Sequence, residues 1–249
     1  LNYVHQAFPV TPSRTFTKNL HKTKMNIVLV LSGSLNPIHY DHVRIMNVAK
    51  EYLESKTTPN TKINVVKGFL CPSSEYYVNN KLKNEALSLK VRNDLTQIMI
   101  DSLKTSADPY TNTNWLELFD KGWANGRDIA KAVYDSHVGT HDNLVVYEVY
   151  GADFCLKTTS WTRTNRNIIC VGRENLNMQI KLLISTTNYV IKRTKTSPFG
   201  HFVLIDRKVN DLSSTQIRRV LKSKDKNRWS EIVTKGWVHE NVLNYLKNL

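Results

Sequence analysis

A stretch near the start of the chain, residues 33–42, has the residue types and spacing of a phosphate-binding corner. It reads GSLNPIHYDH and follows the apolar run of residues 27–31, which predicts a buried strand. Apolar residues after His42 recur at helical spacing, so the strand is expected to turn through a short loop into a helix. Unpaired N–H groups and the positive end of a helix dipole attract anions at such a corner. His39 and His42 are three residues apart and can share a face there, which predicts binding of a nucleoside triphosphate.

A second segment of similar character lies near the C-terminus, at residues 212–221. It reads LSSTQIRRVL, in which Ser213, Ser214 and Thr215 can cap a helix. Arg218 follows within about one turn, so hydroxyls, backbone amides and a guanidinium meet at one helix start. The same pattern is also typical of an ordinary capped helix with solvent-facing arginines, and this segment alone does not decide between the two.

Two further kinds of residue suit the other parts of a nucleotide. Gly151 ends an apolar run and Asp153 follows two residues later, where a carboxylate suits ribose hydroxyls. Trp123 and Trp161 have flat faces that can stack on a heteroaromatic ring, although most tryptophans simply pack.

The elements that must position these residues alternate along the chain. Its 249 residues suffice for one large α/β domain or two small ones. Apolar strand patterns alternating with helical patterns predict a single-domain, Rossmann-like α/β fold, with a doubly wound parallel sheet and helices on both faces. The strand patterns lie near residues 26–32, 62–67, 143–150, 167–172 and 201–206, and the helical patterns near 42–53, 85–104, 122–136, 214–222 and 239–249.

Composition bounds the remaining possibilities. Residues 1–24 are basic and without acidic residues, and we interpret them as a disordered N-terminal extension of the folded domain 25–249. No apolar run approaches the roughly 20 residues that cross a bilayer, so no membrane-spanning segment is predicted. The three cysteines lack CxxC spacing, which indicates neither a disulfide framework nor a zinc ribbon. The net charge of +14, concentrated in residues 177–228, fits a nucleic acid, a membrane surface or small polyanionic substrates.

Taken together and in this order, the motifs resemble one enzyme family. The loop at 33–42, the GAD at 151–153 and the SSTxIR at 213–218 are similar to those of nicotinamide/nicotinate mononucleotide adenylyltransferases of the eukaryotic type. These belong to the nucleotidyltransferases with an (H/T)xGH signature. The resemblance runs from about Met25 to the C-terminus and includes VVKG at 65–68. Asp41 replaces the signature glycine, and a carboxylate there repels phosphates unless it faces away or meets Mg²⁺.

The resemblance implies a reaction and a set of site residues. The reaction is adenylyl transfer from ATP, with Mg²⁺, to nicotinamide or nicotinate mononucleotide, giving NAD or deamido-NAD and pyrophosphate in NAD biosynthesis. Catalytic roles are implied for His39, His42 and Arg218. The implied nucleotide contacts are Gly33, Ser34, Leu35, Gly151, Asp153, Asn210, Ser214, Thr215 and Arg218, and the implied mononucleotide contacts are Lys67, Trp123, Trp161 and Arg173.

Two alternatives stay open at this point. A cytidylyltransferase or a pantetheine-phosphate adenylyltransferase shares the strand-loop-helix and the histidine pair, but not the other motifs. A basic nucleic-acid-binding protein on a nucleotide fold explains the charge but gives His39, His42 and Arg218 no role. We expect ATP, a pyridine mononucleotide and NAD as ligands, no protein-held metal, no nucleic acid and no membrane as partners, a homo-oligomer, and a location in the nucleus or the cytoplasm.

Overall fold

The computed structural model describes residues 23–123, 125–137, 143–163, 166–172, 174–194, 202–207, 212–223, 225 and 227–249. Within them, six parallel strands form one sheet in the order β3-β2-β1-β4-β5-β6. This is the strand order of the doubly wound Rossmann fold, so the predicted fold class is confirmed. The strands are β1 (Thr23–Gly33), β2 (Thr61–Pro72), β3 (Leu116–Leu118), β4 (Leu144–Gly151), β5 (Ile168–Val171) and β6 (Phe202–Ile205).

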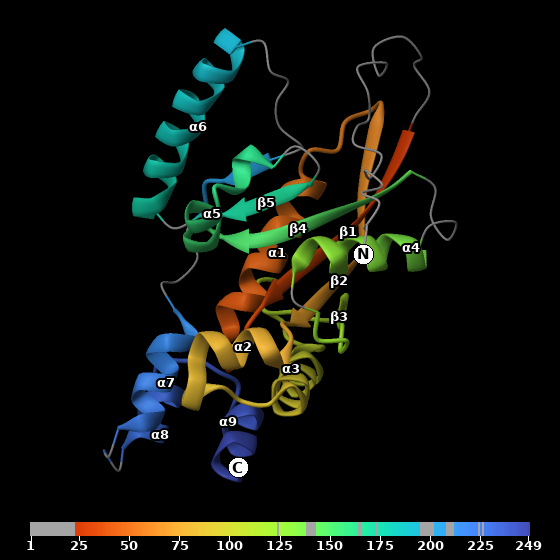
Figure 1. Ribbon diagram of the computed structural model, residues 1–249. Coiled ribbons are helices and arrows are strands. Elements are labelled where there is room, and N and C mark those ends of the chain that lie inside the picture. The colour runs from red at the N-terminus through yellow and green to blue at the C-terminus, as the bar shows by residue number, and fades with distance from the viewer. Residues whose placement is uncertain are drawn as a thin grey trace, which may run out of the picture.

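Helices cover both faces of this sheet and gather beyond the carboxyl ends of β1 and β2 (Figure 1). Two short 3₁₀ helices, η2 (Lys83–Glu85) and η3 (Ser160–Thr162), complete the described elements. No helix among the described residues combines the length and apolar character that crossing a membrane requires. The α-helices are α1 (Tyr40–Glu54), α2 (Glu75–Leu82), α3 (Leu89–Leu103), α4 (Gly126–His137), α5 (Ala152–Thr158), α6 (Glu174–Thr194), α7 (Ser214–Lys222), α8 (Arg228–Thr234) and α9 (Glu240–Lys247).

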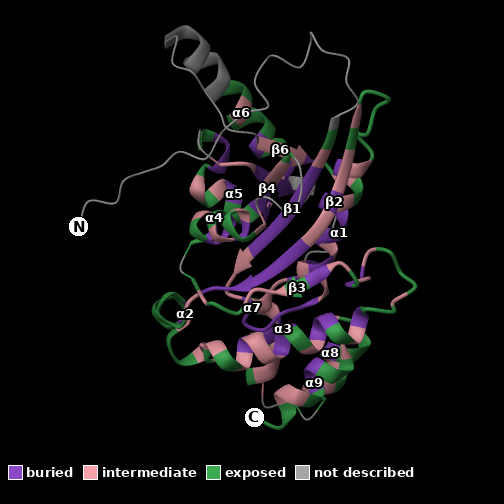
Figure 2. Ribbon diagram, turned by 90° about the vertical axis from the view of Figure 1, so that its right-hand side faces the viewer, coloured by how far each residue is buried: buried purple, intermediate pink, exposed green. Residues whose placement is uncertain are grey.

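Strand β1 is the centre of the core. Ile27 and Leu29 pack on one face of the sheet among residues of α1 and α3, whereas Val28 and Val30 pack on the other face with residues of α4. Burial on both faces explains why the strand is apolar without alternation. Figure 2 shows the same pattern, with buried residues concentrated along the central strands and exposed ones on the outer sides of the helices.

The observed elements extend the predicted ones. Helix α7 has the predicted bounds, and β1 begins at Thr23, two residues before the expected start of the folded domain. The sequence patterns did not indicate β3, α2, α5 and α8, all of which are short, nor the long helix α6. The proposed extension, residues 1–24, lies almost wholly outside the described residues.

The strand order changes direction between β1 and β4. The register pairs Val30 with Glu148, three residues before Gly33 and Gly151, with which the two strands end. In open α/β sheets, ligands bind in the crevice outside the carboxyl ends at this point of reversal. The fold therefore predicts that a ligand site lies between the loop after β1 and the start of α5.

Candidate active site

A cavity of about 410 Å³ opens at this point of reversal. Its walls come from the loop after β1 and from the starts of α1, α5 and α7, with the last turn of α2 closing one side. Segments that are far apart in the sequence therefore line one space. The predicted residues among the lining residues are Ser34, Leu35, His39, His42, Gly151, Asp153, Ser214, Thr215 and Arg218.

The two histidines stand together at the start of α1. His39 is the N-cap residue, and its backbone N–H donates to Nδ1 of His42 at 3.1 Å. Their ring centroids are 3.7 Å apart. Because Nδ1 of His42 accepts a hydrogen bond, the neutral imidazole carries its proton on Nε2. His42 can thus present an N–H donor of the kind that phosphate oxygens accept.

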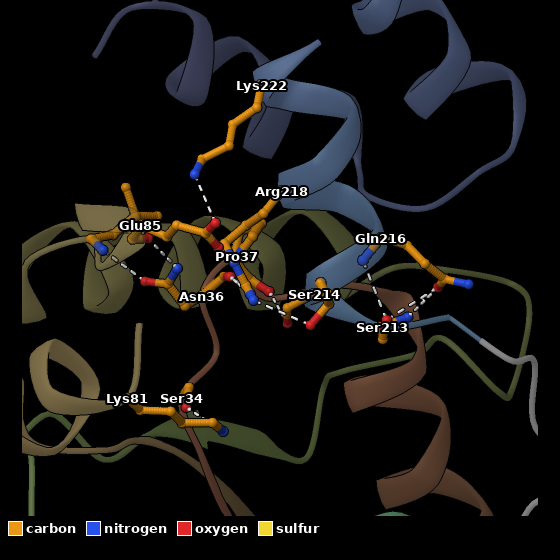
Figure 3. A network of polar contacts seen from close by, with 12 residues as sticks. Ser34, Asn36, Pro37, Lys81, Glu85, Ser213, Ser214, Gln216, Arg218 and Lys222 are labelled. Atoms are coloured by element: carbon orange, nitrogen blue, oxygen red, sulfur yellow. Dashed lines mark hydrogen bonds and ion pairs between the residues drawn. The ribbon is translucent and has the colours of Figure 1, made fainter. Parts of the chain in front are cut away.

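The start of α7 is tied to the loop after β1. Ser213 and Gln216 form a capping box, which defines where the helix begins. The Ser214 hydroxyl donates to the carbonyl oxygen of Pro37 at 2.9 Å, and Nη1 of Arg218 donates to that of Asn36 at 2.9 Å (Figure 3). The two phosphate-binding corners expected from the sequence are therefore parts of one site.

Asp41 is engaged with the protein on both of its carboxylate oxygens. Arg44 donates to Oδ1 at 3.0 Å, and the backbone N–H of Leu212 donates to Oδ2 at 3.1 Å. The carboxylate thus links the first turn of α1 to Leu212, just before α7. Asp41 lines the cavity, and these two bonds hold its carboxylate at the position where the resemblance expects a glycine.

Lys81 is a cavity residue that the sequence analysis did not identify. It lies in the last turn of α2, and its Nζ donates to the Ser34 hydroxyl at 3.2 Å. Burial, followed by the nearby charges of Lys157 and Arg218, lowers the pKa of Lys81. Cations gathered around one cavity favour an anionic ligand. The helix-capping Ser74 was the sequence signal that could have revealed α2 and its lysine.

A buried arginine fixes the loop from behind. Nη1 of Arg92 donates to the carbonyl oxygens of Ser34 at 3.1 Å and Ser73 at 2.7 Å, and its Nε donates to that of Leu87 at 3.0 Å. Burial lowers the pKa of Arg92 to about 10, so the group remains charged at neutral pH. The loop that carries Ser34 is thereby held in place before any ligand arrives.

Lys67 lies away from the cavity, and its expected contact with a mononucleotide phosphate is corrected. It pairs with Val28 in the sheet register, five residues before Gly33 and Pro72 at the carboxyl ends. At about 3.3 Å per residue, this places it some 16 Å from the edge that carries the site. Its Nζ forms an ion pair with Glu117 at 2.7 Å instead.

The two tryptophans have different surroundings. Trp161 is 3% exposed and packs in a core cluster with its ring edge against Phe202, so its expected stacking on a pyridine ring is also corrected. Trp123 is 39% exposed and makes an edge-to-face contact with Phe119, outside the set of cavity-lining residues. Arg173 and Asn210 lie outside the described residues.

The two glycines of the site serve different parts of it. Gly33 ends β1, and its carbonyl oxygen accepts a hydrogen bond from the Ser73 N–H at 2.8 Å. A Cβ atom added at Gly151 would meet no atom within 4 Å, so the cavity has open space against this backbone.

The described residues contain no cluster of three or more His, Cys, Asp or Glu side chains suited to a metal ion.

The fold and the cavity define a Rossmann-like α/β protein with a crevice between β1 and β4, into which His39, His42, Lys81 and Arg218 are gathered. Among solved structures, Plasmodium falciparum nicotinic acid mononucleotide adenylyltransferase complexed with APC has this fold, with a TM-score of 0.57 and 16% identity over 89% of this chain and 94% of that chain. The same enzyme complexed with NaAD gives a TM-score of 0.55 and 15% identity over 90% and 95% of the two chains. Protein-family models and curated proteins give no match.

Proposed function

We propose that this chain transfers the adenylyl group of ATP to a pyridine mononucleotide, giving a dinucleotide of the NAD type and pyrophosphate. The observation that carries the proposal is the meeting of two helix starts in one cavity. The first brings His39 and His42, and the second brings Ser214, Thr215 and Arg218. The adenylyltransferase activity named for the structural neighbours supports the choice of reaction.

In this reaction, an oxygen of the mononucleotide 5′-phosphate attacks the α-phosphorus of ATP. A new P–O bond forms while the bond to the β-phosphate oxygen breaks, and pyrophosphate leaves with that electron pair. The attacking phosphate is already ionised at neutral pH, so the protein needs no general base. Its task is to hold two polyanions in line and to stabilise the charge of the transition state.

The cost of bringing the phosphates together identifies which residues matter. Two phosphate charges about 4 Å apart repel by about 4 kcal/mol at an effective dielectric constant of about 20. His42 and Arg218 would offset this cost at the triphosphate, and Lys81, next to Ser34, is the cavity cation we assign to the mononucleotide phosphate in place of Lys67. Mg²⁺ would enter with ATP, whose phosphate oxygens and bound waters would supply most of its ligands.

The remaining cavity residues suit the nucleosides. We assign Gly151 and Asp153 to the adenosine, since open space lies against the glycine and a carboxylate suits ribose hydroxyls. We assign the half-exposed Trp123 to the pyridine ring, because its indole is accessible near the same edge of the sheet.

The test is product formation from MgATP with nicotinamide mononucleotide and, separately, with nicotinate mononucleotide. Dinucleotide and pyrophosphate in equal amounts would support the proposal, and the ratio of the two kcat/KM values would define the preferred ring. Folded protein that binds MgATP but forms no product with either ring would contradict it. The same assay with pantetheine phosphate, or with CTP in place of ATP, would then identify a related nucleotidyltransferase.

A further inference from the structure

The carboxylate of Glu85 accepts hydrogen bonds from two basic residues of α7, Arg218 and Lys222. Its Oε2 accepts a hydrogen bond from Nε of Arg218 at 2.7 Å, and its Oε1 accepts one from Nζ of Lys222 at 2.7 Å (Figure 3). The hydrogen bonds from Lys222 and Arg218 lower the pKa of Glu85 to about 2. At neutral pH the residue therefore carries a full negative charge against α7.

The position of Glu85 is fixed from the other side by the loop after β1. The Asn36 side chain is buried, and its Nδ2 donates to the carbonyl oxygen of Glu85 at 2.9 Å. Its Oδ1 accepts from the N–H of Leu87 at 2.7 Å. Asn36 thus fixes the backbone of η2 to the loop after β1, and this fixes the position from which the Glu85 side chain extends.

These contacts determine the orientation of the Arg218 guanidinium. Nε donates to Glu85, Nη1 to the Asn36 carbonyl at 2.9 Å and Nη2 to the Thr215 hydroxyl at 3.1 Å. Three segments of the chain therefore fix the plane of one group. A guanidinium has five N–H donors, and each terminal nitrogen keeps a second hydrogen beyond these three bonds.

Glu85 itself does not line the cavity, whereas Arg218 and Thr215 do. The carboxylate thus holds the Nε atom of the guanidinium from outside the cavity wall. We propose that Glu85 is a positioning residue, which orients Arg218 to bind the terminal phosphates of ATP. The inference rests on the proposed function for the identity of the ligand.

A Glu85 carboxylate that only repelled phosphates would change ATP affinity in the opposite direction. A carboxylate close to bound phosphates that did nothing else would repel them, so removing it would tighten ATP binding. A carboxylate that orients an arginine makes binding weaker when it is removed, because the guanidinium then loses its fixed geometry. The direction of the change in affinity therefore decides between the two roles.

The experiment measures Kd by calorimetry for MgATP and for AMP, which lacks the terminal phosphates. We expect Glu85→Ala to raise the Kd for MgATP by about tenfold, the usual size of one hydrogen bond to a charged group, with AMP binding unchanged. Glu85→Gln keeps an acceptor oxygen and should lie between wild type and Glu85→Ala. Glu117→Ala, which removes a glutamate paired with Lys67 away from the cavity, is the matched control and should change neither Kd.

A double-mutant cycle then tests whether Glu85 affects MgATP binding through Arg218. In an Arg218→Ala background, Glu85→Ala should cause no further loss of MgATP affinity. Tighter MgATP binding, equal losses for MgATP and AMP, or independent losses in the cycle would each overturn the proposal. Wild-type protein that binds MgATP but makes no dinucleotide would refute the proposed function alone, and wild-type protein that does not bind MgATP would refute both.

Discussion

At the scale of single residues, the proposed chemistry depends on N–H donors that phosphate oxygens can accept, and His42 is one of them. We expect His42→Ala to lower kcat by about 10²–10³-fold, the typical loss on removing one transition-state donor. Its bond to the His39 N–H is also lost, which should cost only about 1 kcal/mol of folding free energy. Steady-state kinetics and thermal unfolding would measure the two effects, with His137→Ala at the end of α4 as a control. An unchanged kcat would remove His42 from the mechanism.

Two tryptophans that look equivalent in the sequence should behave differently when replaced. Trp161→Ala should lower the free energy of unfolding by about 3–5 kcal/mol, because a buried indole leaves a cavity behind. Trp123→Ala should leave stability within about 1 kcal/mol of wild type, because its side chain is half exposed, and should raise KM for the mononucleotide. Denaturant titration and initial rates test both. A stable Trp161→Ala variant with a raised KM would return Trp161 to the site.

At the scale of elements, a buried arginine joins the loop after β1 to β2 and α3. Arg92→Leu would leave the carbonyl oxygens of Ser34, Ser73 and Leu87 without their donor. We expect the free energy of unfolding to fall by about 3 kcal/mol, because buried acceptors lose charged hydrogen bonds. Urea denaturation would measure it, with Arg127→Leu, a partly exposed arginine in the first turn of α4, as the control. A loss no larger than that of the control would show that the loop is held by other contacts.

The elements also show how far the sequence could lead. An uninterrupted apolar run predicted β1 because that strand is buried on both faces, and serines followed by amphipathic spacing predicted α7 to the residue. β3 has only three residues, one of them the exposed Glu117, and offers too little pattern for a strand. α5 and α8 have seven residues each, which is about two turns and too short for periodicity to stand out.

The sequence predicted those lining residues of the candidate site that lie at the end of a strand or the start of a helix. It did not predict those that reach the cavity through tertiary packing. The carboxyl ends of parallel strands lie at one edge, so the residues after β1 and β4 had to come together. The depth of Lys67 within β2 depends on the register with β1, which the sequence alone does not give. Lys81 reaches the cavity through the packing of α2 against the loop, which is likewise a tertiary contact.

At the scale of the whole molecule, the net charge of +14 is spread in a way that matters for partners. Several cations are paired along their own helices with an acid four residues away, as in Lys50–Glu54, Lys90–Asp94 and Lys131–Asp135. Such pairs reduce the field that a long polyanion would feel over those helices. At the cavity, by contrast, burial lowers the pKa of Lys81, and the nearby charges of Lys157 and Arg218 lower it further.

This distribution predicts salt responses of different size for a small and a long polyanion. MgATP bound in the cavity should lose less than about tenfold in affinity between 50 and 200 mM salt, because few phosphates are neutralised. A 20-nucleotide RNA should bind only non-specifically and lose about 10³-fold or more over the same range. Fluorescence titrations of both ligands on one preparation would measure the two slopes. RNA binding that is tight at 200 mM salt, together with weak MgATP binding, would favour a nucleic-acid-binding protein on this fold over the proposed enzyme.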